Sequence, residues 1–296
     1  MKTESRRSLS VACTIREARD HIARARKAGR TIALVPTMGA LHAGHVSLID
    51  AAVKQGGYVV VSIFVNPTQF GPTEDLDRYP RNLNADMLAC AAAGADLIFA
   101  PSVAEMYPDE NLTWVEVAEL TDTLCGAFRP RHFRGVATVC TKLFNIVQPD
   151  VAFFGQKDAQ QTAVIRRMVH DLNFPLEIVV CPTVREPDGL AMSSRNRYLT
   201  PAERKDAPLL YQALCRCEQM VRAGERDSAT LVAAMQETLA RSAAITPQYI
   251  QIVDADTLED VPAVQGRVLV ALAVILGSTR LIDNIIVDLN AAPANV

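Results

Sequence analysis

Two histidines, His42 and His45, flank a glycine immediately before an amphipathic run that starts at Val46. The residues before them, 31–35, are all β-branched or apolar, and a proline and a glycine then end this strand-like pattern. The order predicts a strand, a glycine-containing loop and the first turn of a helix. Free backbone N–H groups and the positive end of a helix dipole attract anions at such a place. We therefore expect this segment to bind the phosphates of a nucleotide.

The imidazoles of His42 and His45 are suited to chemistry at a phosphate. As hydrogen-bond donors they stabilise the charge that develops when a bond at an α-phosphate breaks and pyrophosphate leaves. The alternatives are a structural role for each ring and a zinc site, and no third ligand with metal-binding spacing lies nearby in the sequence. Phosphate chemistry is the interpretation that we favour.

Two further segments supply positive charge. Lys157 follows a predicted strand and a glycine, where an ammonium group can reach a polyphosphate, although a solvated surface lysine is the alternative. Ser193, Ser194 and Arg195 offer two hydroxyls and a guanidinium in a loop. That loop either closes over a nucleotide as a lid or is a flexible polar linker.

Neutral amides provide the other kind of polar group. Gln69 and Gln161 are able to bind the hydroxyl and carboxylate oxygens of a small polar substrate, or they are ordinary amides. A basic cluster at residues 129–134 either binds anions or lies solvated at the surface. Nothing resembles a Ser-His-Asp triad or an activated cysteine. Cationic and hydrogen-bonding groups dominate, as expected where catalysis rests on positioning and charge stabilisation.

The composition limits the classes of function. The chain has 296 residues, 49% of them hydrophobic, and a formal net charge of −3. This charge argues against nucleic acid or an anionic membrane as the main partner. Seven cysteines without a CxxC pair favour reduced thiols and a cytoplasmic protein. The longest late apolar run, residues 268–276, is too short to span a bilayer.

The hydrophobic periodicity positions these residues. Strand and helix patterns alternate, with strands expected at residues 31–35, 58–65, 97–100, 151–154 and 176–180 and helices at 14–28, 46–55, 83–93, 136–147 and 159–172. This alternation predicts an α/β fold with a doubly wound, Rossmann-like parallel sheet, whose ligands lie beyond the carboxyl ends of the strands. The candidate residues follow the predicted strands directly, which fits that expectation.

The character of the sequence changes near residue 187. A capping box at Thr200 opens a long predicted helix that runs to about Val221. A second helix is expected at 229–240, and strands at 249–253, 268–276 and 282–287. We therefore predict two domains, a nucleotide- and substrate-binding domain at 1–186 and a smaller α+β lid domain at 187–296.

With these residues assembled, the chain resembles the pantoate:β-alanine ligase family of the HxGH nucleotidyltransferase superfamily. The resemblance covers nearly the whole chain and rests on motifs that recur in order, at residues 36–45, 62–70, 79–81, 129–136, 142–145, 154–161, 188–196 and 280–284. A bare HxGH motif indicates the superfamily alone, whereas the later motifs together are specific to the ligase. Family members often carry a glycine where Arg131 stands.

The resemblance implies a reaction in two steps. The carboxylate of pantoate attacks the α-phosphate of ATP, which gives pantoyl adenylate and pyrophosphate. The amine of β-alanine then attacks the activated carbonyl and releases AMP and pantothenate. Within enzymes the alternative is a nucleotidyltransferase that moves AMP onto a phosphate-bearing acceptor. A nucleotide-sensing module without turnover is the alternative from another class.

The resemblance also implies roles for particular residues. His45, His42, Lys157 and Arg195 would be catalytic, and Gln69, Gln161 and Met38 would bind pantoate. The expected ATP-binding residues are Pro36, Thr37, Met38, His42, Gly44, His45, Gly155, Lys157, Asp158, Val184, Met192, Ser193, Ser194 and Arg195, with Asp158 at the ribose. Magnesium is expected with the polyphosphate, with Asp86 as its candidate ligand. The family implies a homodimer built through the larger domain.

Overall fold

The computed structural model describes residues 9–290, which form two compact units. The larger unit contains residues 9–118, 129–156 and 164–182, and the smaller contains 119–128, 157–163 and 183–290. The predicted domains 1–186 and 187–296 are each one continuous stretch of the sequence, whereas each compact unit combines several stretches. The predicted domain bounds therefore stay a prediction. Within residues 9–290, no helix combines the length and the apolar character needed to cross a membrane.

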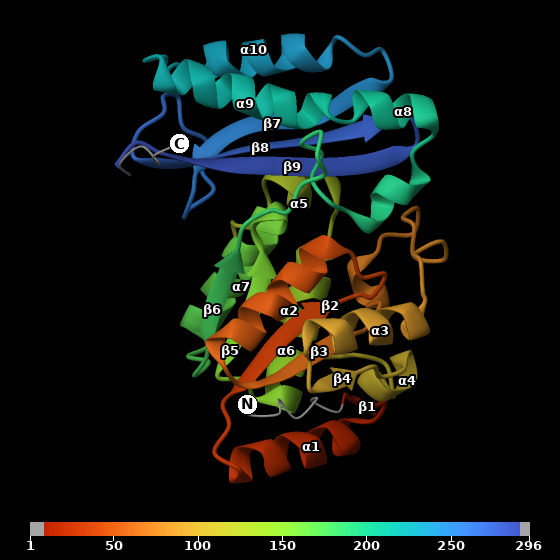
Figure 1. Ribbon diagram of the computed structural model, residues 1–296. Helices are drawn as coiled ribbons and strands as arrows, with labels where there is room; N and C mark the ends of the chain where they lie inside the picture. Colours follow the sequence, from red (N-terminus) through yellow and green to blue (C-terminus); the bar gives the residue numbers. More distant parts are fainter. Residues whose placement is uncertain (1–8, 291–296) are drawn as a thin grey trace, which may run out of the picture. The chain divides into compact units, whose positions relative to one another are not determined.

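The larger unit is built on a six-stranded parallel sheet, which confirms the predicted fold class (Figure 1). The strand order is β1-β4-β3-β2-β5-β6. The strands are β1 (Ser10–Ala12), β2 (Ile32–Thr37), β3 (Tyr58–Ile63), β4 (Leu97–Phe99), β5 (Val151–Gly155) and β6 (Glu177–Cys181). The short edge strand β1 has no counterpart among the predicted elements. The central strands β2 and β3 are mostly apolar and buried, as a sheet covered on both faces requires, and their polar residues Thr37 and Ser62 lie near their carboxyl ends.

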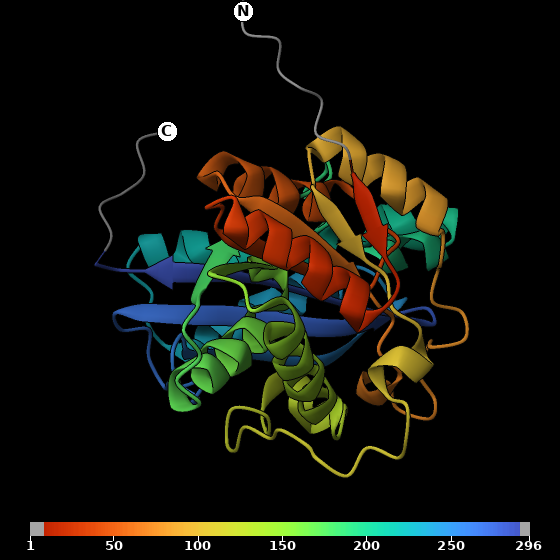
Figure 2. The ribbon, with the colours of Figure 1, turned by 90° about the horizontal axis from the view of Figure 1, so that it is seen from below.

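Helices cover both faces of this sheet. On one face, α1 (Ile15–Lys27), α6 (His132–Val147) and the second half of α7 (Ala159–Asp171) pack against one apolar cluster. Figure 2 shows α1 and α6 lying next to one another. On the opposite face, α2 (Ala43–Gln55) and α3 (Leu83–Ala93) pack against a second cluster. The short α4 (Val103–Met106) follows β4.

The strand order reverses beside β2. From β2 the chain runs outward through β3 to β4 on one side, and β5 and β6 lie on the other side. Parallel pairing of Ala33 with Val151 places the carboxyl ends of β2 and β5 beside one another. In open α/β sheets, ligands bind at such a switch point. The segment with His42 follows β2, so it begins at this position.

The smaller unit contains an antiparallel sheet in the order β7-β8-β9. Its strands are β7 (Ile245–Asp254), β8 (Arg267–Leu276) and β9 (Thr279–Asp288). The helices α9 (Leu209–Arg222) and α10 (Ser228–Leu239) cover one face, and α5 (Leu124–Phe128) packs on the other (Figure 1). Side chains of β8 alternate between the two apolar clusters, because neighbouring residues of a strand point to opposite faces of the sheet.

The prediction of one long helix from Thr200 to Val221 is wrong, because this range is not a single helix. Two helices occupy this range, α8 (Pro201–Asp206) and α9. Pro208 is the N-cap of α9. A proline lacks the N–H that a continuous helix needs and disfavours a helical residue before it, which explains the break. The apolar periodicity carries across the break, so the pattern alone does not reveal it.

Arg131 has the left-handed backbone conformation that favours glycine. It is the N-cap of α6, with φ 67° and no side-chain hydrogen bond to the cap. We expect Arg131→Gly to raise the free energy of unfolding by up to about 1 kcal/mol, because glycine adopts this conformation without steric cost. Chemical denaturation measures the change. A decrease would show that the Arg131 side chain contributes more than its backbone strain costs.

Candidate active site

The two predicted histidines hold the first turn of α2. His42 is the N-cap, and its Nδ1 accepts a hydrogen bond from the backbone N–H of Gly44 at 3.1 Å. The Nδ1 of His45 accepts one from the backbone N–H of His42 at 3.4 Å. The ring centroids lie 4.1 Å apart. The pair forms a reciprocal capping box in which imidazoles replace the usual hydroxyl and carboxylate.

These contacts define where each imidazole carries its proton. A ring nitrogen that accepts an N–H has no proton of its own, so the neutral form of each ring has its proton on Nε2. Both rings are half-buried at the positive end of the helix dipole. His42 and His45 thus each carry an Nε2–H donor at the end of α2 that attracts anions.

Asp86 braces the loop between β2 and α2. Its buried carboxylate accepts hydrogen bonds from the backbone N–H of Ala40 at 3.1 Å and of Leu41 at 2.8 Å. Gly39 has φ +82°, and a Cβ there would lie 2.9 Å from Asp86 Oδ2. The loop therefore needs a glycine and a carboxylate at these two positions to bring the chain into α2.

The described side chains do not form a metal site made of protein alone. Among residues 9–290, no three or more His, Cys, Asp or Glu side chains are grouped so that they could hold a metal ion. Both oxygens of Asp86 already accept backbone N–H groups. The magnesium role of Asp86 stays a prediction that these hydrogen bonds do not favour, and the zinc alternative for His42 and His45 gains no third ligand.

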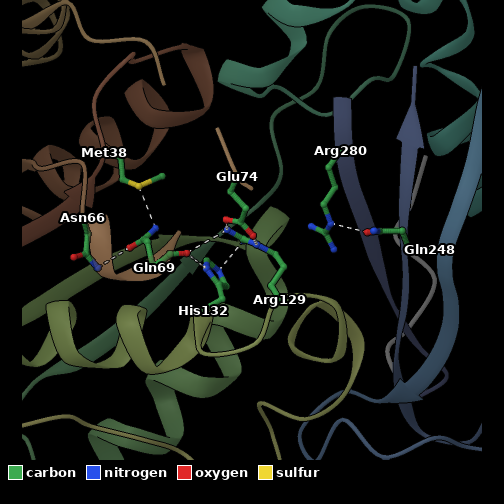
Figure 3. A network of polar contacts seen from close by, with 8 residues as sticks. All are labelled: Met38, Asn66, Gln69, Glu74, Arg129, His132, Gln248 and Arg280. Carbon is green, nitrogen blue, oxygen red and sulfur yellow. Dashed lines mark hydrogen bonds and ion pairs between the residues drawn. The ribbon is translucent and has the colours of Figure 1, made fainter. Parts of the chain in front are cut away.

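Gln69 lies beside Met38 in a network of polar contacts (Figure 3). It ends the turn η1 (Pro67–Gln69), which follows β3 and is capped by Asn66. Its Nε2 donates to the sulfur of Met38 at 3.1 Å, and its Oε1 accepts from Asn66 Nδ2 at 3.1 Å. An amide has two N–H groups and two acceptor lone pairs. These two contacts use one of each, so the Gln69 amide has capacity for a ligand.

Asn66 is a buried residue that was not among the candidates predicted from the sequence. Its Nδ2 also donates to the carbonyl of Gly135, and its Oδ1 accepts from the hydroxyl of Tyr107 at 3.0 Å. Burial raises the pKa of Tyr107, so this hydroxyl stays protonated and remains a donor. Through Asn66, this network holds the side-chain amide of Gln69 in place. The only sequence signal was an asparagine before a proline at a strand end.

Only part of the basic cluster is solvated, because Arg131 is exposed whereas Arg129 and His132 belong to the same network as Gln69. Arg129 Nε donates to Glu74 Oε1 at 2.7 Å, and its Nη1 lies 3.0 Å from His132 Nε2. That nitrogen must accept, so His132 donates from Nδ1 to the carbonyl of Gln69 at 2.8 Å. Burial acts to raise the pKa of Glu74, but Arg129 outweighs it and holds this pKa below its ordinary value.

The backbone of α6 touches the turn that carries Gln69. A Cβ on Gly135 would overlap the carbonyl of Thr68 and come 2.7 Å from the backbone nitrogen of Gln69. Only a glycine permits this approach. Gln69 is thus positioned by α6 as well as by the end of β3.

Lys157 and Asp158 form the turn η2 (Gln156–Asp158) directly after β5. Lys157 Nζ lies 3.8 Å from Asp158 Oδ1, and the Asp158 side chain is half exposed. Gln160 and Gln161 begin α7 and differ in role. The amide of Gln160 is buried and binds the backbone of residues 120, 123 and 125, whereas Gln161 is half-buried. This difference supports the choice of Gln161 as the binding amide.

The predicted loop around Ser193 follows a small hairpin. The backbone N–H of Met192 donates to the carbonyl of Val184 at 3.0 Å. Ser193 then caps the turn η3 (Ser194–Tyr198), where its hydroxyl accepts from the backbone N–H of Arg195 at 3.3 Å. Ser193, Ser194 and Arg195 therefore lie at a capped turn, which argues against a flexible linker.

The predicted residues fall into one group in each unit. The larger unit holds Pro36, Thr37, Met38, His42, Gly44, His45, Gln69, Asp86 and Gly155, and the smaller holds Lys157, Asp158, Gln161, Val184, Met192, Ser193, Ser194 and Arg195. In the first group, Thr37 donates from its hydroxyl to the carbonyl of Ser62 at 2.7 Å, which ties the ends of β2 and β3 together.

Together, the parallel sheet and the imidazole donors at its switch point define a nucleotide-binding α/β enzyme. The model of the pantoate-beta-alanine ligase family matches residues 10–286. The pantothenate synthetase of Moorella thermoacetica is 56% identical over 277 residues, which cover 94% of this chain and 98% of that protein. The chain belongs to the pantoate-beta-alanine ligase family.

Solved structures agree with this assignment. The crystal structure of pantothenate synthetase from Thermus thermophilus is similar to this structure, with a TM-score of 0.89 and 45% sequence identity. The match covers 93% of this chain and 98% of the Thermus chain. The ligase from Francisella tularensis, complexed with beta-gamma ATP and beta-alanine, has a TM-score of 0.79 and 35% identity over 97% of this chain and 100% of that one.

The predicted function is confirmed. The chain is an ATP-dependent ligase that forms a C–N bond between pantoate and β-alanine by way of pantoyl adenylate, with release of AMP and pyrophosphate. The comparisons do not support the alternative, transfer of AMP onto a phosphate-bearing acceptor. They likewise favour an enzyme over a sensing module.

Proposed function

We propose that His42 and His45 stabilise the α-phosphate of ATP during adenylation, with His45 as the main catalytic group. The observation that carries this proposal is the capping box, which leaves an Nε2–H donor on each imidazole at the N-terminus of α2. Charge develops on the phosphate oxygens as pyrophosphate leaves, and these donors oppose it. Pro36, Thr37, Met38, Gly44 and Gly155 supply backbone around the nucleotide.

The smaller unit supplies the cations in this proposal. Lys157 and Arg195 bind the triphosphate and oppose the charge of the leaving pyrophosphate. Ser193 and Ser194 add hydroxyl donors, and Asp158 accepts from the ribose. Val184 and Met192 line the nucleotide site. The capped η3 turn supports this assignment, because the Ser193 hydroxyl binds the backbone N–H of Arg195 and so keeps the two residues close together.

Gln69, Gln161 and Met38 bind pantoate in this proposal. Met38 follows β2 directly and contacts Gln69. The side-chain amide of Gln69 therefore lies next to the loop that leads to His42. Pantoate has a carboxylate and hydroxyls, and neutral amides recognise both without trapping the nucleophile in an ion pair. The carboxylate thereby stays available to attack phosphorus.

We propose magnesium as the partner of the ATP phosphates and not as a protein-held ion. A magnesium ion usually keeps several waters and is bound by one or two carboxylates and the substrate phosphates. When bound, it neutralises polyphosphate charge. The described residues do not provide a cage for it.

Homodimerisation through the larger unit and a cytoplasmic location are further parts of this proposal. All seven cysteines are free thiols in the structure, which fits a reducing compartment. Analytical ultracentrifugation tests the dimer.

One experiment tests the reaction itself. The enzyme is mixed with ATP and pantoate, with and without β-alanine, and the products are separated by chromatography. We expect pyrophosphate and pantoyl adenylate without β-alanine, and pantothenate with AMP when it is present. An adenylated phosphate ester, or ATP binding without pyrophosphate release, would contradict the proposed chemistry.

Gln69→Ala is expected to weaken pantoate binding by about 10-fold or more, the usual scale for a lost hydrogen bond to a charged group. The KM of ATP should change much less, because Gln69 has no assigned contact with the nucleotide. Steady-state kinetics with each substrate varied in turn measures both effects. The exposed Gln236 of α10 provides a control, Gln236→Ala. Equal losses for ATP and pantoate would contradict the assignment of Gln69.

A further inference from the structure

Two adjacent buried polar residues of β9, Asp283 and Asn284, lie on opposite faces of the small sheet. Asp283 pairs with Leu272, which belongs to the apolar cluster under α9 and α10. Asn284 pairs with Ala271, which belongs to the cluster on the other face. Residues opposite one another on antiparallel strands share a face. The two side chains therefore contact different parts of the smaller unit.

On one face, Asn284 holds the backbone of Lys157. Its Nδ2 donates to the carbonyl of Lys157 at 2.8 Å, and Asn284 is 5% exposed. A buried hydrogen bond to this carbonyl fixes the peptide plane that follows Lys157. The direction in which the Lys157 side chain leaves the backbone is set with it.

On the other face, Asp283 holds the hairpin of residues 184–192 through Arg185. The Arg185 guanidinium binds both carboxylate oxygens of Asp283, at 2.6 and 3.0 Å, and the Asp283 side chain is 1% exposed. Arg185 also donates to the carbonyl of Gly189 at 3.1 Å and lies 3.8 Å from the ring centroid of Tyr211. A planar guanidinium in bidentate contact and stacked on a ring has one orientation. The end of this hairpin leads directly into Ser193.

We propose that Asn284 and Asp283 are positioning residues of the adenylation step. Asn284 acts through Lys157, and Asp283 acts through Arg185 and the hairpin on the turn that carries Arg195. This inference rests on the roles proposed above for Lys157 and Arg195. One short piece of β9 thus aligns Lys157 and the turn that carries Arg195, each from its own face of the sheet.

A double-mutant cycle tests the link between Asn284 and Lys157. The rate of pyrophosphate release from ATP and pantoate is measured for the wild type, Asn284→Ala, Lys157→Met and the double variant. We expect Asn284→Ala to lower kcat about 10-fold, within the range expected for a misplaced catalytic group, with the KM of pantoate nearly unchanged. In the Lys157→Met background, Asn284→Ala should have no further effect, because its target side chain is gone.

Thr238→Val is the matched control for Asn284→Ala. Thr238 lies in the same unit, is also 5% exposed, and donates to the carbonyl of Ala234. Thermal unfolding checks that both variants are folded, and the control should slow neither background. An undiminished loss from Asn284→Ala in the Lys157→Met background, or an unchanged kcat in Asn284→Ala alone, would overturn the positioning role. If Lys157→Met itself were fully active, the proposed role of Lys157 would fail instead.

The second arm uses Asp283→Asn, which keeps the shape of the side chain but places an NH₂ group against Arg185. We expect the KM of ATP to rise about 5- to 10-fold in the wild-type background, and no further rise in Arg195→Met. Glu237→Gln is the control, because Glu237 forms an ion pair with Arg216 in the same unit at 2.8 Å. Equal effects of Asp283→Asn with and without Arg195 would overturn this half of the inference.

Discussion

His45→Ala should lower the rate of pyrophosphate release by about 100-fold or more, the usual scale for the loss of one donor to a developing oxyanion. The physical reason lies in the first turn of α2, where the backbone N–H of His42 occupies Nδ1 of His45 and leaves the proton on Nε2. Alanine removes that donor. Rapid-quench measurement of the first turnover isolates this step from the later attack by β-alanine.

Two further variants sharpen this prediction. His45→Asn keeps a polar side chain at the N3 position of α2, so a loss as large as that of His45→Ala assigns the effect to the imidazole. His170→Ala is the control, because this histidine lies exposed on α7, with 85% of its side chain accessible. An unchanged rate in His45→Ala would remove this residue from the mechanism.

Asp86→Asn should lower the same rate by about 100-fold, because loss of the loop conformation misplaces His42 and His45 together. The carboxylate accepts one backbone N–H at each oxygen. An asparagine has a single oxygen, so one N–H of the loop would face an NH₂ group. We also expect the free energy of unfolding to fall by about 1–3 kcal/mol, the scale for an unsatisfied buried polar group.

The magnesium dependence separates the two possible roles of Asp86. If Asp86 braces the loop, the magnesium concentration for half-maximal rate stays the same in Asp86→Asn while the maximal rate falls. A large rise in that concentration would instead identify Asp86 as a metal ligand. Asp96→Asn is the control, since Asp96 is also buried and accepts from the backbone N–H of Val59, near the amino end of β3. It should cost stability without slowing the chemistry of the folded enzyme.

The parallel sheet was predictable because its signals are local. Apolar runs of strand length alternate with helical periodicity, and glycines end α2 and α3 in the left-handed conformation. The placement of His42 and Lys157 followed from one rule, that ligands bind at the carboxyl ends of parallel strands. The strand β1 escaped prediction because three residues are too few to show a period.

The partners of the site residues were not predictable from the pattern. Asp86 is separated by 45 residues from Leu41, and Asn284 by 127 residues from Lys157. A periodic pattern reports which face of an element is buried and carries no information about which distant side chain completes a hydrogen bond. The basic cluster shows the same limit, since its charges alone did not reveal that Arg129 binds Glu74.

The smaller unit consists of three separate stretches of the chain, 119–128, 157–163 and 183–290. Leu124, from the first stretch, helps to cover Val253 and Leu269 of the small sheet. No single cut in the polypeptide can therefore release this unit whole. An exchange of C-terminal halves between two related genes would separate Leu124 and Lys157 from the sheet against which they pack. Few such chimaeras should fold. We therefore expect the coding sequences of the two units to be inherited together, without recombination between them.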